Sequence, residues 1–200
     1  MTNRSPGLQA AITAWVLALV ALPALAHVQE GQAAGFLTGL AHPVSGLDHV
    51  LAMIAVGLWG AQLGAPALWL LPVTFPLVMA FGGFLGLLGL PLPGVEVGIA
   101  LSALALGLAV ATGWRPPLAV AALLVAAFAV FHGHAHGTEL PQGQSGLAYS
   151  IGFVVATGLL HLAGIGIGVI HRWPVGRGVL RVLGAGVAAG GAYFLSRALA

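Results

Sequence analysis

Long apolar stretches, separated by short breaks rich in proline, glycine and arginine, dominate the 200-residue chain. A membrane-crossing helix needs about 20 predominantly apolar residues. The pattern predicts an all-α, polytopic bundle with six transmembrane helices, at 46–63, 67–90, 95–113, 117–136, 145–170 and 179–197. The preceding segment, 31–41, is too short to cross. We expect an interfacial or re-entrant helix there, broken at Pro43 because proline lacks an N–H donor.

The first 26 residues have the organisation of a secretory signal peptide. Arg4 supplies a positive start, Leu8 to Leu22 an apolar core, and Ala24-Leu25-Ala26 a small-x-small cleavage site. The predicted organisation is therefore a signal peptide, 1–26, and a single transmembrane domain, 27–200. An uncleaved first membrane helix is the alternative interpretation. After cleavage, the terminal amine and imidazole of His27 could together bind metal.

The composition agrees with an integral membrane protein. Hydrophobic residues make up 60% of the chain and charged residues only 5%, against roughly a quarter charged in globular proteins. The six basic residues are scattered arginines, so no basic patch for nucleic acid is present. Cysteine is absent, which excludes disulfides and thiolate metal sites. The 31 glycines favour close helix packing, with homo-oligomers also compatible.

The arginines predict the orientation, because positive charge is retained on the cytoplasmic side. With the mature N-terminus outside, the loops with Arg115 and with Arg172 and Arg177 both fall inside. Glu96 and Glu139 then lie at outer ends. We expect a multi-pass protein of the bacterial inner membrane with a periplasmic N-terminus.

Two histidine clusters provide the candidate chemistry. The first is His42-Pro-Val-Ser-Gly-Leu-Asp48-His49, and the second runs from Phe131-His132 through His136 to Glu139. Ionisable groups at membrane depth are costly and mark functional sites. On a helix, His132 and His136 share one face, with Glu139 three residues further, whereas His134 points elsewhere. Both clusters are expected at outer ends of spans, where they can converge.

The residue types indicate a metal-ion path. Imidazole and carboxylate suit nickel, cobalt, copper or zinc, and Asp48 is either a direct ligand or a partner that orients a histidine. Met53 lies on the same helix face as His49 and is a weaker candidate ligand. His161, deep in the fifth predicted span, is either a relay ligand or a core imidazole bonded to a hydroxyl or carbonyl, and His171 near the inner end could receive the ion.

At these residues the chain resembles the HupE/UreJ family of bacterial nickel and cobalt permeases. The family motif H-P-x-x-G-x-D-H with a following methionine is matched by the first cluster, and a second block by Phe131 to Glu139. The resemblance implies uptake of Ni²⁺ or Co²⁺ for hydrogenase or urease maturation. It also implies metal capture by His42, Asp48 and His49, with His132, His136 and Glu139 as partners and His134 as a weaker member.

We therefore expect a secondary permease that is not an enzyme, has no permanently bound cofactor, and transports Ni²⁺ or Co²⁺. Its indirect partners would be hydrogenase or urease maturation proteins. No G-x-x-x-x-G-K-[ST] phosphate loop is present. Two alternatives remain: an intramembrane zinc-dependent hydrolase, with Asp48 or Glu139 as base and Ser45 nearby, and a non-transporting accessory protein or metal sensor.

Overall fold

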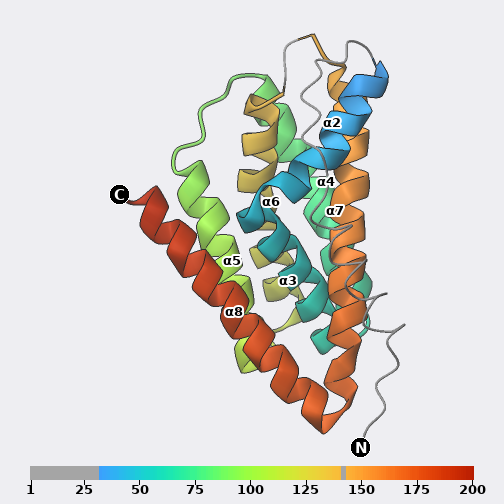
Figure 1. Ribbon diagram of the computed structural model, residues 1–200, viewed down its shortest axis with the longest axis vertical. Coiled ribbons are helices and arrows are strands. Elements are labelled where there is room, and N and C mark those ends of the chain that lie inside the picture. Colours follow the sequence, from blue (N-terminus) through green and yellow to red (C-terminus); the bar gives the residue numbers. More distant parts are fainter. Residues whose placement is uncertain (1–31, 141–142) are drawn as a thin grey trace, which may run out of the picture.

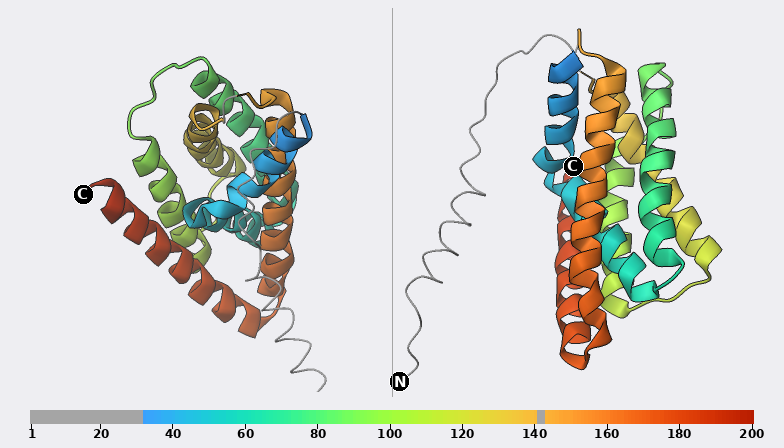
Figure 2. Two further views of the ribbon diagram at one scale, coloured as in Figure 1. Left: turned by 45° about the horizontal axis from the view of Figure 1, so that its top comes forward. Right: turned by 90° about the vertical axis from the view of Figure 1, so that its right-hand side faces the viewer.

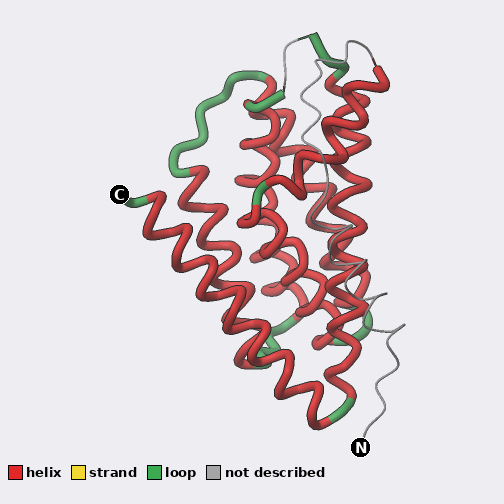
Figure 3. The backbone as a smooth tube through the Cα atoms, in the orientation of Figure 1, coloured by secondary structure: helices red, strands yellow, loops and turns green. Residues whose placement is uncertain are grey.

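The computed structural model describes residues 32–140 and 143–200, and every regular element in these ranges is helical (Figures 1 and 3). The predicted signal peptide and His27 lie outside the described residues. The helices are α2 (Gln32–Ser45), α3 (Leu47–Leu63), α4 (Ala67–Leu87), α5 (Val95–Thr112), α6 (Leu118–Thr138), α7 (Gly146–Gly168), the 3₁₀ turn η1 (Val169–Arg172) and α8 (Pro174–Ala198).

Five helices, α4 to α8, are long and apolar enough to cross a membrane, α7 doing so together with η1. Helices α2 and α3 would form a sixth span if the bent pair is counted as one. The expected break at Pro43 is wrong: α2 continues through Pro43 to Ser45, and the 83° bend follows at Gly46. Gly46 has extended backbone angles, φ −99° and ψ 115°. These angles end the helix, whereas Pro43 removes only one N–H donor from the helical hydrogen bonds.

The helices pack in pairs that lie far apart in sequence. Helix α4 packs along α6, α5 along α8, and α7 contacts both α2 and α3 (Figures 1 and 2). Glycines form many of these contacts: a Cβ on Gly82 would collide with the Val130 carbonyl, and one on Gly164 with the Ile54 carbonyl. Small residues let helix backbones approach closely where lipid supplies no hydrophobic drive for association. Packing therefore holds α2, α3, α6 and α7 around one interior.

Not every glycine serves this purpose, and a matched pair on α7 tests the difference. We expect Gly164→Ala to destabilise the protein by about 1–3 kcal/mol, because the added methyl group forces α7 away from α3. Gly166 has open space around its Cα, so Gly166→Ala should leave stability unchanged or raise it through helix propensity. Thermal unfolding of both variants in detergent provides the measurement. Equal unfolding temperatures would contradict close packing at Gly164.

The outward faces of the bundle are apolar. Leu77 on α4, Leu123 on α6, Leu147 on α7 and Val182 on α8 are 67%, 70%, 74% and 72% exposed. Such a surface would be an aggregation liability in water and suits contact with lipid chains. The fold is thus that of a multi-pass membrane protein, in agreement with the predicted helical class.

Charged residues separate toward the two ends of the bundle. Glu96 begins α5 and Glu139 follows α6, whereas Arg115 follows α5 and Arg172 ends η1. In Figure 1 the loop between α4 and α5 lies at the top and η1 at the bottom. Glu96 and Glu139 therefore lie at one end and Arg115 and Arg172 at the other, as the alternation of spans predicts, whereas Arg197, in the last turn of α8, lies away from the η1 end.

Candidate metal centre

The elbow between α2 and α3 places the first histidine cluster inside the bundle. Gly46 forms the bend, and Asp48 and His49 occupy the first turn of α3. A Cβ at Gly46 would lie 2.9 Å from Asp48 Oδ1 and 3.1 Å from His49 Nδ1. Glycine is therefore the residue that leaves room for these two side chains to fold back over the start of the helix.

Asp48 orients His49. Its Oδ1 accepts a hydrogen bond from the His49 backbone N–H at 2.8 Å and another from the ring Nδ1 at 3.0 Å. A carboxylate only accepts, so the ring proton lies on Nδ1 and Nε2 carries a lone pair. Nε2 is buried without a hydrogen-bond partner among the described residues. This carboxylate–histidine arrangement is the one that commonly sets the tautomer of a metal ligand.

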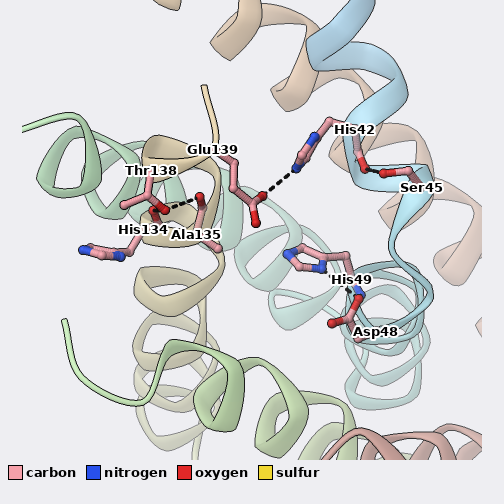
Figure 4. A network of polar contacts seen from close by, with 8 residues as sticks. All are labelled: His42, Ser45, Asp48, His49, His134, Ala135, Thr138 and Glu139. Carbon is pink, nitrogen blue, oxygen red and sulfur yellow. Dashed lines mark hydrogen bonds and ion pairs between the residues drawn. The ribbon is translucent and has the colours of Figure 1, made fainter. Parts of the chain in front are cut away.

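His42, His136 and Glu139 form an outer group where α2 meets the end of α6. Their candidate ligand atoms all lie within 4.8 Å of one another, and Glu139 Oε2 accepts a hydrogen bond from His42 Nε2 at 2.9 Å (Figure 4). Metal–nitrogen bonds of about 2.0–2.1 Å bring two ligand atoms within at most about 4.2 Å. Side-chain movements of less than about 1 Å would thus let the three residues bind one ion.

His49, His132 and His136 form an inner group of imidazole rings in edge-to-face contact. The His49 ring centroid lies 4.7 Å from that of His132 and 4.6 Å from that of His136. His136 also contacts His42 of the outer group at 4.7 Å. Both ring nitrogens of His136 are buried and lack partners in the described part of the chain. His136 therefore connects the outer group to the inner one.

The two groups form a series that runs from the surface into the bundle. The side chains of Glu139 and His42 are 51% and 27% exposed, and that of His49 is 12% exposed. His136 and His132 are 4% and 0% exposed as residues. A cavity of about 250 Å³ opens beside the outer members. An ion bound at Glu139 could lose its water molecules stepwise as imidazole nitrogens replace them.

His161 on α7 lies further along, on the other side of a phenylalanine ring. The Phe75 ring contacts His132 with centroids 5.3 Å apart and His161 with centroids 5.4 Å apart. The His161 Nδ1–H donates to the Pro72 carbonyl at 3.2 Å, while its Nε2 is buried and unpartnered within the described ranges. The expectation of a carbonyl-bonded core imidazole is thus met at one nitrogen, and the other remains available.

Two further predicted ligands lie elsewhere. The His134 Nε2–H donates to the Leu90 carbonyl at 2.7 Å, and Figure 4 shows its ring pointing away from His42 and Glu139. This agrees with the expectation that His134 faces away from His132 and His136. Met53 is fully buried in the hydrophobic core.

Sequence reasoning missed several neighbours of the site. Glu96 lines the cavity, Ser102 hydrogen-bonds to His132, and the Phe153 ring contacts that of His136 at a tilt of 59°, with centroids 4.0 Å apart. Glu96 and Ser102 are polar residues in an otherwise apolar stretch, a signal that could have marked them. Phe153 carried no such signal, because aromatic residues are common in membrane helices.

Together, these features define a polytopic membrane protein with a histidine–carboxylate site that leads into its helix bundle. Residues 15–194 match the family described as HupE / UreJ protein. The chain is also 49% identical over 180 residues to Protein HupE of Rhizobium leguminosarum bv. viciae, covering 90% of this chain and 94% of that protein. The chain belongs to the HupE/UreJ family. No solved structure matches it.

Proposed function

We propose that this protein is a secondary permease that carries Ni²⁺ or Co²⁺ from the periplasm across the inner membrane for hydrogenase or urease maturation. Membership of the HupE/UreJ family supports a nickel or cobalt transport role linked to these enzymes. The observation that carries the proposal is the inward series of buried imidazole nitrogens that have no hydrogen-bond partner among residues 32–140 and 143–200, on His49, His132, His136 and His161. Imidazole is a suitable ligand for both metals.

In the proposed path, the ion is captured by His42, His136 and Glu139 and passes to His49 and His132. His161 receives it beyond Phe75. Asp48 keeps His49 in the ligand tautomer throughout. A divalent ion moving inward gains about 4.6 kcal/mol per 100 mV, at about 2.3 kcal/mol per charge, so the membrane potential can drive accumulation without nucleotide hydrolysis.

The geometry disfavours the form of the hydrolase alternative in which Asp48 is the base and Ser45 takes part. A hydrolytic site needs a base free to activate water and a metal with an open position. Asp48 Oδ1 already accepts two hydrogen bonds from His49, and the Ser45 hydroxyl donates to the His42 carbonyl at 2.6 Å. Both groups are thus engaged in shaping the elbow.

Uptake of radiolabelled nickel tests the proposal in cells that lack other nickel importers. Cells with the intact chain should accumulate nickel at submicromolar concentration, and collapse of the membrane potential should release the accumulated excess. Asp48→Ala, at equal membrane abundance, should raise the half-saturating nickel concentration about 10- to 100-fold, because His49 loses its orienting carboxylate. Absence of both nickel and cobalt uptake by the intact chain would refute the permease.

Uptake should also weaken on acidification. Histidine binds metal only when its imidazole is neutral, and protonation near the ordinary imidazole pKa of about 6.5 competes with the ion. Metal affinity is therefore fully present above this pH and is lost on acidification, at a lower pH for an imidazole that is buried, because burial disfavours the charged form. Proteoliposomes under a fixed potassium diffusion potential allow the external pH to change from about 7.5 to 5.5 at constant driving force. Uptake that rises on acidification would contradict histidine ligation.

A further inference from the structure

Ser102 is a buried hydroxyl in the middle of α5, and it lies between two polar groups. Its Oγ is 2.6 Å from the Ile99 carbonyl oxygen and 2.8 Å from His132 Nε2. Ser102 and His132 are both fully buried. A buried hydroxyl is costly unless it is hydrogen-bonded, and both contacts of Ser102 meet that requirement.

The proton count gives the direction of both hydrogen bonds. Two oxygens 2.6 Å apart need a proton between them, and a carbonyl oxygen cannot supply one. The single Ser102 proton therefore points to the Ile99 carbonyl. The Ser102 oxygen then accepts from His132, so the ring proton lies on Nε2 and Nδ1 carries the lone pair. Nδ1 is buried and has no hydrogen-bond partner in the part of the chain that is described.

At His161 a backbone carbonyl fixes the position of the ring proton, as the Ser102 hydroxyl does at His132. In a regular helix the Pro72 carbonyl would accept from the N–H of residue 76, but residue 76 is also proline and has no N–H. The carbonyl accepts from His161 Nδ1 instead. The His161 proton is thereby held on Nδ1, and Nε2 is left bare. Each deep histidine thus has one nitrogen fixed by the protein and one free.

We propose that Ser102 is a positioning residue for metal transfer: its hydroxyl holds His132 as the Nε2–H tautomer and leaves Nδ1 to take the cation from His49. This inference rests on the proposed function. A ring free to place its proton on either nitrogen would offer a bare Nδ1 for only part of the time. Loss of such a partner typically lowers metal affinity about 10- to 100-fold.

Nitrogen NMR of ring-labelled histidine tests the tautomer directly. The purified full chain is studied without metal at about pH 8, where an ordinary imidazole is neutral, and the His132 signals are identified by their loss in His132→Gln. The intact protein should show protonated Nε2 and bare Nδ1, and Ser102→Ala should lose this preference. A protonated Nδ1 in the intact protein would overturn the proposal.

Nickel uptake tests the consequence. Ser102→Ala should raise the half-saturating nickel concentration at least about tenfold. Ser102→Cys fills the same space with a weak acceptor, so it should behave like Ser102→Ala. Ser196→Ala is the matched control, because that exposed serine donates to the carbonyl three residues earlier, as Ser102 does. A half-saturating concentration that Ser102→Ala leaves within about twofold, or that Ser102→Cys leaves normal, would overturn the proposal.

The two measurements separate this inference from the proposed function. If the intact chain takes up neither nickel nor cobalt, the permease fails, whereas the NMR spectrum still reports the tautomer of His132. If the chain transports nickel and His132 is protonated on Nδ1, only the role of Ser102 fails.

Discussion

Replacing His136 with glutamine is expected to reduce nickel uptake to the level of cells without the protein. His136 is the residue shared by the outer and inner groups, with its ring 4.7 Å from His42 and 4.6 Å from His49. Its removal takes a ligand from the proposed capture site and interrupts the path to His132. The loss of uptake should be larger than that caused by removing a partner that only orients a ligand, which is about 10- to 100-fold.

His134→Gln is the matched control for this variant. His134 lies two residues away on the same helix and is also buried, but it donates to the Leu90 carbonyl. Glutamine retains an N–H donor for that carbonyl, so we expect normal membrane abundance and nickel uptake within about twofold of the intact chain, well below the effect of losing a ligand's partner. The comparison is made on initial rates of radiolabelled nickel uptake at equal abundance. If the two variants were equally impaired, His136 would have no special role in the path.

Glu139→Gln is expected to remove about half of the stabilisation that nickel gives to the purified protein. An ion that binds only the folded state stabilises it by about 2.7 kcal/mol at 100 times its Kd. The Glu139 carboxylate is the anionic member of the outer group, and the neutral amide is a weaker ligand. A tenfold loss of affinity at the same nickel concentration leaves about 1.4 kcal/mol. The measurement is the unfolding temperature in detergent with and without nickel.

Two controls make this result specific. His171→Gln removes a histidine in η1, whose ring donates to the Gly168 carbonyl at the opposite end of the bundle, so it should keep the full nickel effect. Mg²⁺ prefers oxygen ligands in octahedral geometry and should stabilise the intact chain little. An undiminished nickel shift in Glu139→Gln would place the binding site elsewhere.

Much of the fold could be predicted from the sequence, because lipid imposes simple rules. Helices α4 to α8 follow the predicted apolar runs, since a backbone in lipid must satisfy its hydrogen bonds within the helix. The relation among His132, His134 and His136 also follows from helical periodicity alone. Local patterns suffice where the helix itself decides which residues share a face.

The elbow and the partners of the histidines could not be predicted in the same way. Pro43 carries the stronger breaking signal, yet the chain bends at Gly46, where Asp48 and His49 need the space of a side chain. The Ser102 hydroxyl reaches His132 across 30 positions of sequence, and the Pro72 carbonyl reaches His161 across 89. Such contacts depend on which helices become neighbours.

The sequence by itself therefore determined the class of protein, the approximate position of helices α4 to α8, and the residue types able to bind a divalent metal. Composition and helical periodicity are local properties, and they do not depend on how the helices pack against one another. Only the tertiary structure decided that His42 meets Glu139 across 97 positions of sequence, that His136 joins two groups of ligands, and that Ser102 faces His132. These relations arise from close packing at glycines, which sets the spacing and rotation of the helices.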